Sequence, residues 1–138
     1  MAYLIDTDTI IFALRNDKSV LSQFAAHKNS AISISMITYA ELVFGAKRSS
    51  NEQKNLAKVK QICELYPIEE LNLSVMETFA DIKAKMFSRG IRIEDMDLFI
   101  AATAICNDLT LVTNNTKHFE NVPNLRLENW TGRNNTEK

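Results

Sequence analysis

Short apolar runs alternate along this chain with longer segments of helical periodicity, and that alternation limits the folds open to it. The runs are rich in β-branched and other apolar residues, which predicts strands at 3–5, 31–35, 68–71 and 109–113, with 125–127 as a short fifth. When strands alternate with helices, the strands form a mostly parallel sheet and the helices cover both of its faces. The sequence therefore predicts a three-layer α/β/α fold with a central sheet of four to five strands.

The helices are predicted from apolar residues spaced three and four positions apart. They cover a short segment at 10–14 and the ranges 18–27, 38–47, 51–66, 74–89 and 94–107. Pro67 ends the helix before it, since a proline disfavours helical backbone in the preceding residue. Ser74 is the predicted N-cap of the next helix, and Gly90 lies just past its end, where glycine is favoured.

Length and composition are those of one small domain. A chain of 138 residues with 46% hydrophobic residues can bury one core, which we place at 1–130, and the polar segment 131–138 is predicted to be a flexible tail. The formal net charge of -1 excludes a polybasic nucleic-acid binder. A nucleic-acid partner would need a local basic patch or an assisting metal ion.

Two further features predict a cytoplasmic protein with no membrane span. No apolar stretch reaches the roughly 20 residues of a transmembrane helix, and Asp6 and Asp8 interrupt the apolar N-terminus before a signal-peptide core could form. Cys63 and Cys106 lack the spacing of metal ligands and lie among apolar residues, so they are predicted to be buried, reduced thiols.

Three acidic residues stand where predicted strands end or helices begin. Asp6 directly follows the first predicted strand. Glu41 lies in the first turns of the helix that follows the second strand, and Asp97 lies near the start of the helix that precedes the fourth strand. In open α/β sheets ligands collect at the carboxyl ends of the strands, so these acids and Asn115 are expected at one edge. Carboxylate oxygens suit Mg²⁺ or Mn²⁺, and two such ions about 4 Å apart can clamp a phosphoryl group during displacement. The pattern favours phosphodiester hydrolysis.

Each of these acids also has an ordinary structural explanation. Asp6 could cap the helix that follows it, and Glu41 and Asp97 could stabilise the positive ends of their helices. Considered one at a time, capping is the better explanation, and only the combination indicates a metal site. For Glu94 and Asp95, the preferred interpretation is a solvated helix start.

Two histidines and the tryptophan are interpreted as structural residues. His118 follows the fourth strand and is interpreted as an exposed loop histidine rather than a general base. His27 stands at a helix end, where its charge would suit the helix dipole. Trp130 is predicted to pack in the core or in an interface.

Four segments spread over almost the whole chain carry a family resemblance. They are LIDTDTII at 4–11, ITYAELVFGA at 37–46, DLFIAATA at 97–104 and LVTNNTKHFENVPNLRLENW at 111–130, of which the last is the most specific. Together they resemble the PIN-domain ribonucleases, and among these the VapC toxins of bacterial toxin–antitoxin pairs. By that resemblance Asp6, Glu41 and Asp97 fall on the family's metal-binding acids. Asn115 falls where many members carry a fourth acid.

The amide at position 115 is a departure from the family pattern. An amide oxygen can bind a cation weakly or through water, but it adds no negative charge, so a second metal ion would be less occupied. Asp8, Glu94 or Asp95 could compensate, and the sequence does not choose among them. Thr7 and Thr113 either donate hydrogen bonds to the liganding carboxylates or close the turns at the strand ends.

The resemblance implies a PIN fold and a Mg²⁺- or Mn²⁺-dependent endoribonuclease toxin. Structured RNA loops are the implied substrates, either a transfer-RNA anticodon stem-loop or a ribosomal RNA loop. A VapB-type antitoxin that wraps the toxin and blocks its site is the implied partner, and homodimerisation is also expected.

Two other functions compete with this one. The run Asp6-Thr7-Asp8-Thr9 after a strand also resembles the opening motif of haloacid dehalogenase-like phosphatases, in which the first aspartate attacks phosphate and the second acts as acid and base. The late acidic pair of those enzymes has no counterpart here, because Asn114 and Asn115 follow the fourth strand. The third hypothesis is an inert module that sequesters a partner protein, with catalysis lost through Asn115.

Overall fold

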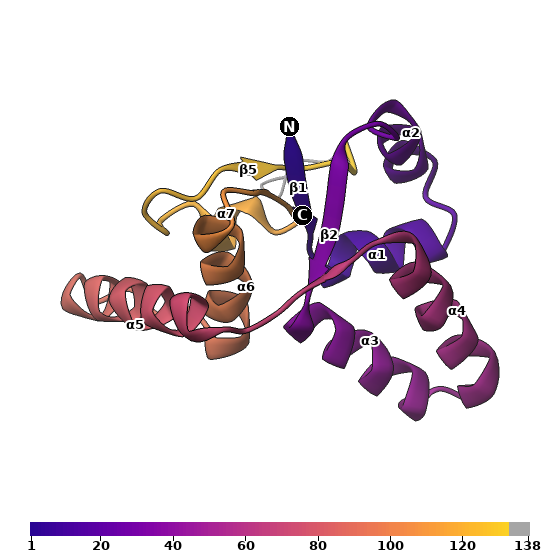
Figure 1. Ribbon diagram of the computed structural model, residues 1–138, viewed down its shortest axis with the longest axis horizontal. Helices are drawn as coiled ribbons and strands as arrows, with labels where there is room; N and C mark the ends of the chain where they lie inside the picture. Colours follow the sequence, from indigo (N-terminus) through magenta and orange to yellow (C-terminus); the bar gives the residue numbers. More distant parts are fainter. Residues whose placement is uncertain (133–138) are drawn as a thin grey trace.

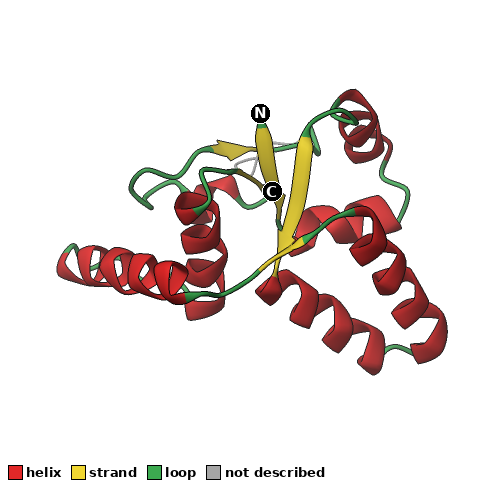
Figure 2. Cartoon of the chain, viewed as in Figure 1, coloured by secondary structure: helices red, strands yellow, loops and turns green. Residues whose placement is uncertain are grey.

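The computed structural model describes residues 1–132, which form one sheet with helices on both sides (Figures 1 and 2). In chain order the elements are β1 (Ala2–Ile5), α1 (Thr7–Leu14), α2 (Lys18–Ala26), β2 (Ala31–Ser35), α3 (Met36–Arg48), α4 (Glu52–Leu65), β3 (Ile68–Glu69), α5 (Leu73–Ser88), α6 (Asp95–Cys106), β4 (Thr110–Val112), α7 (Thr116–Phe119) and β5 (Leu127–Glu128). The strand order is β3-β2-β1-β4-β5, and every neighbouring pair is parallel. The predicted α/β fold is confirmed, with the fifth strand present.

Successive residues of the central strand β1 face opposite helical layers. Leu4 is fully buried in a core that includes Ile82 of α5. Its neighbours Tyr3 and Ile5 belong to a second core, which includes Leu42 of α3. Side chains of a strand point alternately to its two sides, so one buried strand serves both cores. In Figure 1, α5 and α6 accordingly lie on one side of the strands and α1, α3 and α4 on the other.

Capping residues set where several helices begin. Ser35 caps α3 by accepting the Thr38 N–H at 2.9 Å, so that helix starts at Met36, two residues earlier than predicted. The predicted N-cap of α5 was Ser74, which is wrong. Asn72 caps this helix instead, because its side-chain oxygen accepts the Val75 N–H at 3.0 Å.

The ends of the remaining elements follow the prediction with small shifts. Gly90 follows the end of α5 with φ of +69°, a left-handed conformation that suits glycine, as predicted. The outer strands β3 and β5 have two residues each, shorter than their apolar runs indicated. The single-turn helix α7 was not predicted, since four residues are too few for a periodic pattern.

The C-terminal part of the described chain packs against the start of the chain. Trp130 is buried, as predicted, and its ring stacks on that of His27 with centroids 4.7 Å apart. Thr131 is also buried, and its hydroxyl donates to Asn114 Oδ1 at 2.9 Å. Thr131 thus packs with the residues that precede it. The rest of the predicted tail, 133–138, lies outside the described residues.

Cys63 and Cys106 are free thiols, as predicted. Each is only half-buried, whereas the prediction was full burial. The reason is their position at the margins of the two cores, because Cys63 packs beside the Ile5 core and Cys106 is the last residue of α6. No helix within residues 1–132 combines the length and the apolar character that a membrane span requires.

Candidate active site

Asp6 is placed at the carboxyl edge of the sheet by strand β1 and the start of helix α1. It is the N-cap of α1, and its Oδ1 accepts the Thr7 N–H at 2.8 Å. Its Oδ2 accepts the Thr113 hydroxyl, also at 2.8 Å. The two residues meet because β1 and β4 pair Ile5 with Val112, and the next residue of each strand follows at the same edge. Asp6 is 7% exposed, so this carboxylate is buried as well as hydrogen-bonded.

Glu41 joins Asp6 through Thr7. It lies in the second turn of α3, where its Oε1 is 2.6 Å from the Thr7 hydroxyl oxygen. The same hydroxyl is 3.0 Å from that of Thr38. A carboxylate only accepts hydrogen bonds and a hydroxyl has one proton, so Thr7 donates to Glu41 and accepts from Thr38. Thr7 thus contacts both acids, Asp6 with its backbone and Glu41 with its side chain.

Asp8 contacts the segment that follows β4. Its Oδ2 accepts the backbone N–H of Asn114 at 3.1 Å, and its Oδ1 accepts the Thr9 hydroxyl at 3.0 Å. Asp8 therefore fastens the start of α1 to the loop that carries Asn115. The Asn115 side chain is exposed and makes no capping bond to α7. The backbone N–H of Asn115 donates to the Thr113 hydroxyl oxygen at 3.0 Å.

Asp97 lies in the first turn of α6 and forms a hydrogen bond with His118. Its Oδ2 is 3.0 Å from Nε2 of His118, which is a residue of α7 and half-buried, not an exposed loop residue. Asp95 points elsewhere, since its carboxylate pairs with Lys83 of α5 at 2.8 Å. Glu94 is the N-cap residue of α6 and makes no side-chain capping bond. The motif DMDLF could not reveal these different partners.

Burial and neighbouring charges raise the pKa of the Asp6 carboxyl. Burial is the main cause that raises the pKa of Asp6 from 3.8 to about 7, followed by the charge of Asp8. The hydrogen bonds from Thr113 and Thr7 lower this pKa, and the charge of Asp97 raises it. Burial likewise raises the pKa of Asp8. Asp97 is therefore close enough for its charge to act on the Asp6 carboxyl.

The predicted acids lie at the carboxyl edge of the sheet, but their side chains do not converge on a single position. Within residues 1–132, no three His, Cys, Asp or Glu side chains are grouped so as to hold a metal ion. The donor set nevertheless fits a hard divalent cation, since it consists of carboxylate oxygens and negative charge gathers around buried Asp6. Glu41 uses Oε1 and Asp97 uses Oδ2 in their hydrogen bonds, which leaves the second oxygen of each carboxylate for a ligand.

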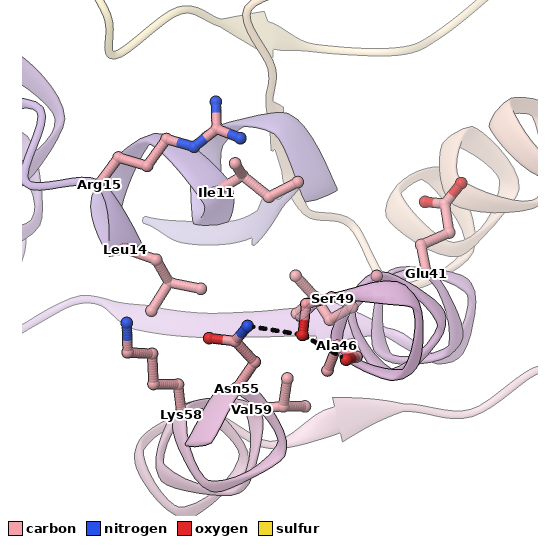
Figure 3. Close-up of a pocket in the computed structure, with 11 residues that line it drawn as sticks. Ile11, Leu14, Arg15, Glu41, Ala46, Ser49, Asn55, Lys58 and Val59 are labelled. Atoms are coloured by element: carbon pink, nitrogen blue, oxygen red, sulfur yellow. Dashed lines mark hydrogen bonds between the residues drawn. The ribbon is translucent and has the colours of Figure 1, made fainter. Parts of the chain in front are cut away.

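A pocket of about 390 Å³ lies beside Glu41, between α1, α3 and α4. Its walls combine apolar side chains such as Leu14 and Val59 with polar ones such as Asn55. Figure 3 shows Arg15 and Lys58 on one side of this pocket and Glu41 on the other. The pocket has room for an apolar side chain of a bound molecule next to Glu41.

Comparison with known proteins identifies the family. The PIN domain family matches residues 3–125. Over 132 residues, the chain is 33% identical to the ribonuclease VapC2 of Rickettsia felis, a match that covers 94% of this chain and 98% of that protein. This chain belongs to the VapC family of PIN-domain ribonucleases. Another VapC relative, the tRNA(fMet)-specific endonuclease VapC of Salmonella typhimurium, is 29% identical over 130 residues, covering 94% of this chain and 98% of that one.

Solved VapC structures have the same fold. The crystal structure of VapBC2 from Rickettsia felis bound to a promoter DNA fragment matches with a TM-score of 0.89 at 32% identity, covering 94% of this chain and 99% of that one. DNA-bound VapBC from Salmonella typhimurium matches with a TM-score of 0.88 at 29% identity, covering 94% and 98%. The resemblance to the PIN domains is confirmed, and the haloacid dehalogenase alternative is set aside.

Proposed function

We propose that this VapC-family protein is a Mg²⁺- or Mn²⁺-dependent endoribonuclease toxin whose catalytic acids are Asp6, Glu41 and Asp97. The observation that carries the proposal is the placement of buried Asp6, with its pKa raised to about 7, between a hydroxyl link to Glu41 and the charge of Asp97. Uncompensated negative charge of this kind is relieved by a divalent cation.

Asp6, Glu41 and Asp97 would hold the cation, with Asn115 as a weak or water-mediated ligand. When bound, the cation lowers the pKa of an attacking water and neutralises charge that develops on the phosphate oxygens. The protein's own contribution is orientation. Thr7 and Thr113 fix the acids by hydrogen bonds, and such neighbours of ligands commonly set both their direction and their basicity.

Asp8 has a different role in this proposal. Because it accepts the Asn114 N–H, it keeps the Asn115 loop against the start of α1. Its charge also adds to the field at Asp6. We assign the compensation for the missing fourth acid to Asp8 rather than to Asp95, since the Asp95 carboxylate is engaged by Lys83.

The proposed substrate is a structured RNA whose loop bases are unstacked. One relative is named a tRNA(fMet)-specific endonuclease, which favours a transfer-RNA anticodon stem-loop over a ribosomal RNA loop. Proteins read RNA sequence mainly on such splayed bases, because the major groove of an RNA helix is too narrow for side chains. The cytoplasm is the expected place of action.

The proposed partner is a VapB-type antitoxin. The solved relatives include VapBC toxin–antitoxin structures, and we expect the protein to form homodimers that assemble with the antitoxin. The pocket beside Glu41, which is lined in part by apolar side chains, offers a partner segment a place to bind next to that acid. An antitoxin bound there would block substrate access.

The proposal is tested with the purified, antitoxin-free protein and total cellular RNA. Incubation with Mg²⁺ or Mn²⁺, followed by mapping of new RNA ends, should yield discrete cuts that a chelator abolishes. Cuts in an anticodon loop would identify transfer RNA as the substrate. Absence of cuts by folded protein would instead favour the inert module that only binds a partner.

A further inference from the structure

His118 makes a contact with Asp97 that the proposed mechanism does not yet use. Its Nε2 lies 3.0 Å from Asp97 Oδ2, and the two side chains are 29% and 31% exposed. Both groups are thus largely withdrawn from water. A hydrogen bond in such surroundings is stronger than one at an open surface.

Buried neighbours hold both partners in place. Phe119, next to His118 in α7, is 1% exposed, and the two rings meet edge to face with centroids 5.4 Å apart. Leu98, next to Asp97 in α6, is 2% exposed. The backbone N–H of His118 also donates to the Asn115 carbonyl at 3.1 Å. The contact is therefore fixed by the packing of two helices.

The chemistry of the pair gives His118 a defined role. A carboxylate accepts hydrogen bonds only, so Nε2 of His118 carries a proton and donates a hydrogen bond to Oδ2. Oδ1 of Asp97 is then the oxygen that remains for a ligand. Thr7 does the same for Glu41 by occupying Oε1. Thr113 and Thr7 together fix Asp6.

We propose that His118 is the positioning residue of Asp97: it holds one carboxylate oxygen so that the other faces the edge where Asp6 and Glu41 lie. His118 also connects Asp97 to the turn that carries Asn115, because His118 and Asn115 belong to the same turn. This inference rests on the proposed function, since the oxygen it orients is a proposed ligand of the cation. Without His118, the Asp97 carboxylate can rotate and divalent-ion binding weakens.

The test measures Mn²⁺ and Mg²⁺ binding calorimetrically on the full chain, with no RNA present. His118→Ala should weaken ion affinity by about 10- to 100-fold, the usual effect of losing a hydrogen-bond partner of a ligand. His118→Gln can place an amide N–H near the position of Nε2 and should restore most of the affinity. His118→Asn is one carbon shorter and should not. Lys117→Ala changes the exposed neighbour on α7 and should bind ions as the wild type does.

Thermal unfolding and RNA cleavage on the same variants separate the possible causes. Gln and Asn variants that fold equally well but differ in ion affinity support positioning, and they decide the matter even if the Ala variant fails to fold. Equal affinity in the wild type, Gln and Asn variants would overturn the inference, as would Gln binding no better than Asn. A wild type that binds ions but cuts no RNA contradicts the proposed function alone. A wild type that binds neither ion overturns both.

Discussion

The hydroxyl of Thr113 donates a hydrogen bond to Asp6 Oδ2 at 2.8 Å, across 107 positions of sequence. The parallel pairing of β1 with β4 makes this contact possible, because it aligns the last residues of both strands. The same hydroxyl oxygen accepts the Asn115 N–H at 3.0 Å. Thr113 therefore connects the buried acid to the loop that carries the proposed weak ligand.

Thr113→Val tests this connection, since valine keeps the branched shape and removes the hydroxyl. Asp6 then loses a hydrogen bond that lowers its pKa, so its pKa should rise further above the present value of about 7. RNA cleavage near neutral pH should fall by about 10- to 100-fold. The pH–rate profile measures both effects. Thr113→Ser, which keeps the hydroxyl, should stay near the wild-type rate, and a valine variant as fast as the wild type would refute the role.

The stability of the metal-free protein should depend on the Asp6 proton. The pKa of this carboxyl is raised from 3.8 to about 7 in the folded state, so the folded protein holds the proton over a pH range where the unfolded chain has lost it. The free energy of unfolding should therefore fall as pH rises from about 4 to about 7, where this contribution is lost. Urea unfolding across this range measures it. Asp6→Asn should flatten the dependence, and a variant with an unchanged slope would contradict the assignment.

Asn115→Asp places a carboxylate at the position proposed as a weak ligand of the cation. The added charge should tighten Mn²⁺ binding by about tenfold, because affinity for a hard cation rises with the number of anionic ligands. Isothermal titration calorimetry gives the change. Asn121→Asp adds the same charge at another exposed position and serves as the control. Equal tightening in both variants would mean that position 115 acts only through net charge.

Much of the fold could be predicted because periodicity and turn chemistry act locally. The strand at 31–35 has the predicted bounds, and Asp6 follows β1 as expected. Asn72 was missed because both Asn72 and Ser74 are good capping residues, and only the backbone path selects one of them. The two-residue strands β3 and β5 are limited by pairing with their neighbours, which sequence periodicity does not encode.

The site could be predicted only in part, for a related reason. The acids were singled out as candidates because Asp6 follows a strand and Glu41 and Asp97 lie in the first two turns of helices. Their hydrogen-bond partners come from distant segments of the chain, as His118 does for Asp97. A local sequence pattern does not predict such a pair. The short helix α7, which carries His118, was itself not predicted.

Trp130 should be the main stabilising side chain of the C-terminal segment. It is 2% exposed, stacks on His27, and meets Tyr3 and Phe24 edge to face. Trp130→Ala should lower the free energy of unfolding by about 3–5 kcal/mol, as expected for truncating a large buried aromatic side chain. Urea denaturation measures the loss. Phe87→Ala is a suitable control, since that ring is 80% exposed and its removal should change stability by less than about 0.5 kcal/mol. Similar losses in both variants would contradict the packing role.

In the proposed function, the acids at the carboxyl edge of the sheet bind a divalent cation and cleave RNA. The most direct measurement compares cleavage of the mapped RNA by the wild type, Asp6→Asn, Asp97→Asn and Asp81→Asn at saturating Mn²⁺. Asp81 pairs with Lys85 on the exposed side of α5, so its variant is a matched control. The two site variants should fold and yet lose at least about 100-fold in rate, while the control cleaves as the wild type does. Cleavage at the wild-type rate by folded Asp6→Asn or Asp97→Asn would show that these carboxylates are not catalytic.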